Sequence, residues 1–120
     1  MQWKIDSSRP VYVQIMEHVR SAVLSNEYPP GSRIPSVREL AALANVNPNT
    51  MQRAMTELEQ QGLLISTGTL GRFVTEDKAV IEALRQEAIR DAVKICVARF
   101  RELGLSMQEA AKLLSQEEEV

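Results

Sequence analysis

The sequence predicts a mostly α fold with a small β-hairpin, in which three helices precede the hairpin and two follow it. Apolar residues recur at steps of three and four in five separate segments, as they do along one face of an α-helix. Two short β-prone runs, GLLIS and GRFVT, surround the glycine-containing turn TGTLG at 67–71. From residue 76 the pattern changes to one long apolar stripe, so the chain is expected to have two parts.

Length and composition limit the possible classes of protein. With 120 residues the chain is one ordinary domain, or a small domain with an appendage, and has no room for a second large catalytic domain. A single cysteine, Cys96, excludes an internal disulfide, and with the single His18 it disfavours a Cys/His metal site, so no cofactor is expected; carboxylate-bound cations stay open. We find neither an export leader nor a membrane-spanning apolar run, and we expect a cytoplasmic location.

Charge is unevenly distributed along the chain. The total is −2, but residues 1–75 hold seven basic and six acidic residues, whereas residues 76–120 hold seven basic and ten acidic ones. The usual explanation of such a contrast is solvated surface. It gives slight support to an anionic partner for the first part.

The first helix is expected to begin at Pro10 and to stop near Asn26, with a buried stripe of Val11, Ile15, Val19, Ala22 and Val23. The proline-rich connection NEYPPGSRIP follows, and only Arg33 and Ile34 in it can form a very short strand. A capping box at the start of SVREL, residues 36–40, then opens a second, short helix that ends before Pro48.

The third helix has unusually well-specified ends. Asn47 is expected to be its N-cap and Pro48 its first residue, and Gly62 can take the left-handed conformation just beyond its C-terminus. Its buried stripe is Met51, Ala54, Met55 and Leu58. The exposed face is left to Asn49, Gln52, Arg53 and Thr56.

The tail predicts one long helix from Glu76 and Asp77 to Gly104 and a last helix that starts at a second capping box, Ser106 with Glu109. The last helix should run through Leu114, and SQEEEV should fray. The apolar band of the long helix is too wide for one short partner helix to cover, so we expect a homodimer. The expected interface is Ile81, Leu84, Ala88, Ile89, Ala92, Val93, Cys96, Val97, Phe100 and Leu103.

Two short helices joined by a turn, the second starting with small polar residues and followed by a β-hairpin, form a winged helix-turn-helix. Residues 1–75 are thus a predicted DNA-binding domain and residues 76–120 a helical dimerisation region. A major groove about 12 Å wide admits a helix, whose N-terminal half lies nearest the base edges. Free backbone N–H groups in that first turn also attract phosphate.

The stretch from PVYVQIMEHV to LEQQGLL resembles the DNA-binding domain of the GntR family of bacterial transcription regulators, across roughly residues 10–75. Three motifs occur in the order and spacing of that family: YPPGSRIPSVRELA, VNPNT and LEQQGLL. The short tail is similar to that of the YtrA-type subfamily, in which it serves dimerisation. The resemblance implies a repressor that occludes a promoter, with an operon for a membrane transporter as a candidate target.

The resemblance also implies residue roles. Arg38 matches an arginine of the family that contacts DNA, and Thr50 matches a phosphate-facing threonine. Pro48 and Gln52 stand where several relatives carry guanine-reading arginines, and a glutamine suits adenine instead. In the wing, Leu70 occupies a position that is often basic, which leaves open which wing residue enters the minor groove. The DNA-binding candidates are Arg33, Ser36, Arg38, Asn47, Asn49, Thr50, Gln52, Arg53, Gly71 and Arg72.

Structural roles compete with several of these assignments. Arg38 can pair with Glu39 or Glu59, Arg53 can pair with Glu57 one helical turn away, and the Asn47 side chain is used by its role as cap. For Arg33 and Arg72, a phosphate contact and an ordinary surface position are equally consistent with the sequence. His18 is expected to be a solvated side chain, and Cys96 is expected to pack in the apolar stripe of the long helix.

Two functions from different classes fit the sequence. A homodimeric regulator predicts a roughly palindromic double-stranded operator with half-sites about 10 bp apart, or a multiple of that spacing. The rival is a winged-helix protein–protein adaptor without DNA readout. An enzyme has no support, because no phosphate-binding loop, metal cluster or nucleophile–base pair is visible. The tail is too small to enclose a metabolite, so an effector is expected at the dimer interface or between the two parts.

Overall fold

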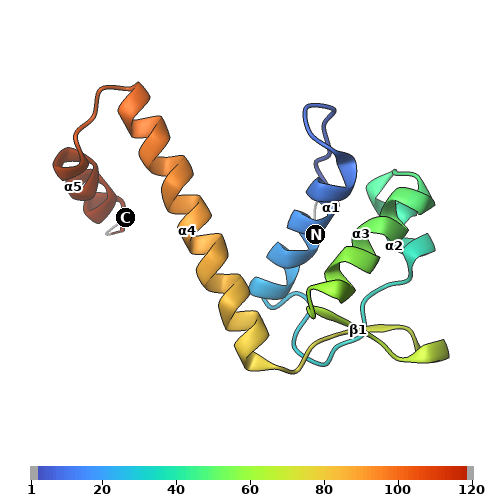
Figure 1. Ribbon diagram of the computed structural model, residues 1–120. Helices are drawn as coiled ribbons and strands as arrows, with labels where there is room; N and C mark the ends of the chain where they lie inside the picture. The colour runs from blue at the N-terminus through green and yellow to red at the C-terminus, as the bar shows by residue number, and fades with distance from the viewer. Residues whose placement is uncertain (1–2, 119–120) are drawn as a thin grey trace. The chain divides into compact units, whose positions relative to one another are not determined.

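The computed structural model describes residues 3–118, with side chains through residue 117, and divides into two compact units, Met1–Leu84 and Arg85–Val120. Its elements in chain order are α1 (Val11–Leu24), α2 (Val37–Ala44), α3 (Pro48–Gln60), β1 (Leu64–Ser66), the 3-10 turn η1 (Gly68–Leu70), β2 (Arg72–Val74), α4 (Lys78–Glu102) and α5 (Met107–Glu118) (Figure 1). The predicted fold class, mostly α with one small hairpin, is confirmed. No helix within residues 3–118 has the length and apolar character needed to cross a bilayer.

The core of the first unit lies between α1, α2, α3 and the hairpin. Its fully buried large side chains come from all of these elements: Ile15, Val19, Leu40, Met51, Met55, Leu58, Leu64 and Val74. Each such burial stabilises the fold by about 1.5–3 kcal/mol relative to an exposed side chain. The predicted stripes of α1 and α3 are therefore correct, and they hold α3 by one face while the other faces solvent.

The hairpin is a two-stranded antiparallel sheet in which Leu64 pairs with Val74 and Ser66 with Arg72. Arg33 adds an isolated bridge to Phe73, and the Ile34 N–H donates to the Arg72 carbonyl at 3.0 Å. The very short strand expected at 33–34 is thus reduced to this single bridge. It ties the segment before α2 to the wing.

Local capping follows the sequence closely. The Ser36 hydroxyl accepts from the Glu39 N–H at 3.2 Å and donates to Glu39 Oε1, which starts α2. The same arrangement at Ser106 and Glu109 starts α5. Asn47 Oδ1 accepts from the Asn49 N–H at 2.7 Å and so starts α3.

The end of α5 differs from the prediction. The helix continues beyond Leu114 through Glu118, so four residues of the segment expected to fray are helical; residues 119 and 120 lie outside the described range. Gln and Glu are good helix formers, and the Ser115 hydroxyl bonds back to the Ala111 carbonyl at 3.0 Å. The polar composition that suggested fraying is also that of a solvated helix end.

Candidate nucleic-acid interface

The helix α3 presents a polar face at its N-terminal half. Asn49, Gln52 and Arg53 are exposed, whereas Thr50 is half-buried. Because Asn47 uses its side-chain oxygen to cap the Asn49 N–H, it serves the helix, as the capping interpretation predicted. The exposed polar face is therefore carried by a helix whose start is fixed by its cap and whose opposite side is locked in the core.

A concave surface connects this face to the wing. A cavity of about 400 Å³ is lined by residues from the segment before α2, from α2, from α3 and from the hairpin. Six of the ten predicted DNA-binding residues line it: Arg33, Ser36, Arg38, Gln52, Gly71 and Arg72. We call this surface the cradle. Among the residues that the structure describes, its lining includes three arginines and no acidic residue, although the chain as a whole is acidic.

Two of the three cradle arginines have no internal partner. Arg33 and Arg38 are exposed, and neither side chain forms a hydrogen bond or an ion pair with any residue in the described range 3–118. The pairing of Arg38 with Glu39 or Glu59, considered above, does not occur in this structure. A cationic side chain without an internal partner beside a polar helix face is available to an external anion.

Arg72 is different, because its Nε atom is paired with Glu59 on α3, and both side chains are less than a third exposed. Glu59 therefore holds Arg72 of β2 against α3 and offsets its charge. The pair fixes the wing relative to α3. It leaves Arg72 less available to phosphate than Arg33 or Arg38.

Gly71 lies under the Arg33 guanidinium. A Cβ atom at this position would come within 2.9 Å of Arg33 Nε, and the φ of +109° is one that residues with side chains rarely adopt. The backbone conformation requires glycine here, and the exposed Arg33 side chain lies over the space that a Cβ atom would fill. The contribution of Gly71 to the cradle is the space it leaves.

Arg53 contacts a residue that the sequence did not indicate. Its guanidinium lies over the Tyr12 ring of α1, with 3.7 Å between Cζ and the ring centroid, instead of pairing with Glu57. Gln52 donates from Nε2 to the Thr56 hydroxyl at 3.2 Å. Tyr12 and Arg53 are far apart in sequence and belong to different helices, so no local spacing rule could have joined them.

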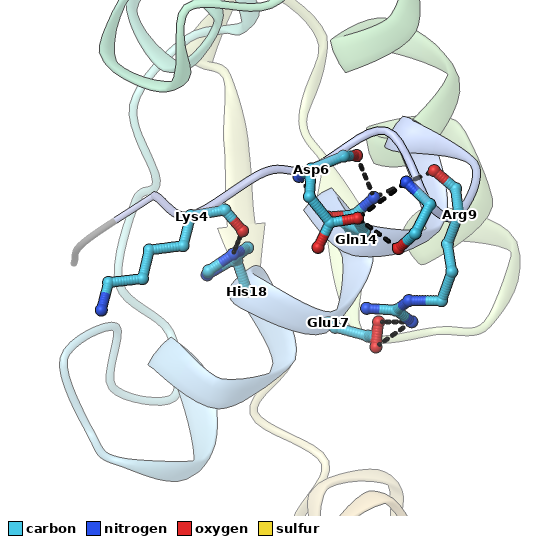
Figure 2. A network of polar contacts seen from close by, with 7 residues as sticks. Lys4, Asp6, Arg9, Gln14, Glu17 and His18 are labelled. Carbon is cyan, nitrogen blue, oxygen red and sulfur yellow. Dashed lines mark hydrogen bonds and ion pairs between the residues drawn. The ribbon is translucent and has the colours of Figure 1, made fainter.

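The segment before α1 is bound across that helix (Figure 2). Gln14, which is 2% exposed, accepts from the Asp6 N–H and donates to the carbonyls of Asp6 and Arg9, at 2.8–3.0 Å. Arg9 forms an ion pair with Glu17. His18 contacts the Trp3 ring and lies 3.3 Å from the Lys4 carbonyl, so the expectation of a merely solvated histidine was wrong.

Two of the ten predicted dimer residues belong to the first unit. Ile81 and Leu84, at the start of α4, are partly buried against its hydrophobic core. They have a packing role within one chain, whatever else they contact. Substituting Leu84 would therefore disturb that core, and Leu84 is not a clean probe of dimerisation.

The second unit displays a large apolar surface. Ile89, Val93 and Leu103 of the predicted set are about half exposed or more, while Cys96, Val97 and Phe100 are half-buried and Ala88 and Ala92 are exposed. Further exposed apolar residues that the prediction did not include are Ile95 on α4 and, on α5, Met107 at the first position and Leu113 and Leu114 in the second half. Residues 3–118 contain no group of His, Cys, Asp and Glu side chains able to hold a metal ion.

Comparison with known proteins bears on both units. Residues 11–74 match the family described as bacterial regulatory proteins, gntR family. The chain is 34% identical over 109 residues to the HTH-type transcriptional regulator YhcF of Bacillus subtilis, covering 91% of this chain and 90% of that protein. It is 30% identical over 104 residues to the HTH-type transcriptional repressor YtrA of the same organism, covering 86% and 80%.

Solved structures give the same result. A GntR family transcriptional regulator from Listeria monocytogenes superposes with a TM-score of 0.85 at 30% identity, over 93% of this chain and 98% of that one. AraR(DBD) in complex with operator ORX1 superposes with a TM-score of 0.55 at 27% identity, over 62% of this chain and 99% of that one. The winged helix-turn-helix fold and the family resemblance read from the sequence are both confirmed. The chain belongs to the GntR family of bacterial regulatory proteins.

Proposed function

We propose that this protein is a sequence-specific DNA-binding transcription regulator that acts as a homodimeric repressor. The observation that carries the proposal is the cradle: Arg33 and Arg38, both without partners in residues 3–118, lie beside the exposed face of α3 in a concavity lined by no acidic residue. A surface with these properties suits a phosphate backbone running past a helix in the major groove.

The residues divide into two kinds of contact. Arg33, Arg38 and Thr50 bind phosphates and set the position of the protein on the duplex. Asn49 and Gln52, both exposed, are the proposed readers of base edges, where an amide forms its best bidentate contact with adenine; Gln52 would turn from the Thr56 hydroxyl to do so. The operator half-site is therefore expected to contain adenine where the α3 face meets the major groove.

Dimerisation supports this function. The exposed apolar residues of α4 and α5, such as Val93 and Leu114, would be covered by a second copy of the chain. A two-fold dimer presents two copies of α3 to a roughly palindromic operator, with half-sites about 10 bp apart or a multiple of that spacing. The relative YtrA is named a repressor. We extend repression by promoter occlusion to this chain; control of a transporter operon rests on the family resemblance alone.

The dimer has a direct test. Val93→Glu places a charge on the exposed apolar surface and should give a monomer by light scattering, whereas Ala98→Glu adds the same charge on a different face of α4 and should leave the dimer intact. A dimer with Val93→Glu would place the interface elsewhere. Operator affinity should fall only for the variant that becomes a monomer.

DNA binding is tested with the full chain and a duplex selected from a random library, together with any inverted repeat that overlaps the promoter of its own gene. Binding followed by fluorescence anisotropy should weaken by orders of magnitude between about 50 and about 200 mM salt. No duplex binding, or binding indifferent to salt, would contradict the proposal and favour a protein–protein adaptor.

A further inference from the structure

The tip of the wing carries one large apolar side chain, Leu70. Leu70 is 67% exposed, and the tip, residues 67–71, contains no charged side chain. Neighbouring Gly68, Thr69 and Gly71 offer no apolar cover. In the free protein this side chain stays in water, which is unfavourable for an isobutyl group.

The tip that presents Leu70 is a closed turn. The Thr67 N–H and hydroxyl both donate to the Gly71 carbonyl, at 3.0 and 3.2 Å, and the Leu70 N–H donates to the Thr67 carbonyl at 3.1 Å. Figure 1 shows this turn, η1, projecting at the end of the β1–β2 hairpin. Leu70 is thus held on a preformed projection, so inserting it into a partner requires little additional ordering.

The wing tip adjoins the part of the cradle that α2 and α3 form. Gln52 on α3, Arg33 and Arg38 before and in α2, and the wing residues on either side of Leu70 all line the cradle. With α3 in the major groove, the phosphate backbone comes next and the minor groove lies beyond it. The cations of the cradle would lie against the backbone, and the projecting tip would reach the minor groove.

Leucine has no donor or acceptor, so it can neither bind phosphate nor read a base edge. What it can do in a minor groove is pack against sugar carbons or enter as a wedge between base pairs, which unstacks a step and bends the duplex. Pyrimidine–purine steps, TA above all, are the ones that unstack most easily. Such a wedge selects sequence by deformability at a position that no polar group contacts.

We propose that Leu70 is an apolar minor-groove wedge that bends the operator and selects a pyrimidine–purine step flanking the sequence contacted by α3. This rests on the proposed DNA-binding function and adds a second, indirect means of sequence selection. The partner is double-stranded DNA, and the chemistry recognised is the apolar wall of the minor groove.

The test uses Leu70→Ala with Leu43→Ala as the matched control, because Leu43 on α2 is equally exposed, at 66%, and does not line the cradle. Leu70→Ala should bind the selected operator roughly 5- to 150-fold more weakly for each half-site, which is the usual effect of losing one base-pair position. It should also reduce the bend measured by fluorescence energy transfer between the duplex ends. Leu70→Met, which keeps an apolar side chain of similar length, should retain both affinity and bend.

Two further measurements separate a wedge from other roles. Binding-site selection with Leu70→Ala should lose the preference at the flanking step and keep the preference at positions facing α3. The salt dependence should not change, because no charge is removed. If the unaltered protein binds and bends the operator, and Leu70→Ala and Leu43→Ala show the same affinity and bend, the wedge is overturned and the proposed DNA-binding function stands. If the unaltered protein shows no salt-dependent binding to duplex DNA, both the wedge and the proposed function are overturned.

Discussion

Replacing Arg38 with alanine gives a quantitative test of the cradle. Arg38 is exposed and has no partner within residues 3–118, so its removal breaks no internal ion pair and should leave stability close to that of the unaltered protein. Any loss of DNA affinity then reports a lost contact with DNA. Arg72→Ala would not allow this conclusion, because it also leaves Glu59 without its partner.

The size of the effect follows from counterion release. Each phosphate neutralised contributes a slope of about −0.9 in log affinity against log salt, and a dimer carries two copies of Arg38, so the slope should become shallower by about 1.8. Between about 50 and about 200 mM salt, a fourfold change, the affinity of the variant should therefore fall by a factor roughly 12-fold smaller than that of the unaltered protein. At the lower concentration the loss of affinity should be similar for every duplex sequence, because phosphate contacts carry no base information.

The assay is fluorescence anisotropy of a labelled operator at several salt concentrations, with a random duplex measured in parallel. Lys94→Ala is the control, since Lys94 is an exposed cation on α4, outside the cradle. It removes the same charge from the protein and should leave the slope unchanged. Equal slopes for Arg38→Ala and the unaltered protein would refute the phosphate contact, and equal changes in both variants would show that total charge, not the cradle, sets affinity.

Three further substitutions test the surroundings of the cradle. Glu59→Gln should release Arg72 to phosphate, which raises duplex affinity and steepens the salt slope; an unchanged slope would mean that Arg72 does not reach DNA. Gly71→Ala should cost more stability in urea than Gly68→Ala, because Gly71 has φ +109° and ψ −161°, which essentially only glycine adopts, whereas Gly68, at φ +59°, lies in the left-handed region that alanine can enter at a cost of about 1–2 kcal/mol. Gln14→Leu should lower the unfolding free energy by about 1–3 kcal/mol, because three backbone groups lose their partner; a smaller loss would mean that water replaces the amide.

The sequence predicts well those features that depend on neighbouring residues. The caps at Ser36, Asn47 and Ser106 each require a side chain within three residues of the N–H group it bonds, so spacing alone identifies them. Helical periodicity likewise identifies the buried side of α3 because its geometry is fixed. The family resemblance then assigns roles to positions such as Arg38.

Contacts between distant side chains could not be predicted in this way. Arg53 had an obvious local partner in Glu57 but lies over Tyr12, and Arg72 pairs with Glu59 across two elements. A long, flexible arginine has many possible partners, and its choice depends on how helices and strands pack, which periodicity does not specify. The end of α5 was missed for another reason: its polar residues suit both a solvated helix and a frayed end.

The distribution of free cations explains why a protein of net charge −2 is still suited to DNA. Arg53 lies over an aromatic ring and Arg72 is paired, so Arg33 and Arg38 remain as the unpaired cations of the cradle. Two contacts in a monomer give a slope of about −1.8, whereas four in a dimer give about −3.6, or roughly 150-fold in affinity between about 50 and about 200 mM salt. The contribution of phosphate contacts to DNA affinity is thus modest for a monomer and substantial only for a dimer. A monomeric variant such as Val93→Glu should accordingly lose both affinity and about half of the salt slope, because the number of phosphate contacts is doubled only when the apolar surface of the tail joins two chains.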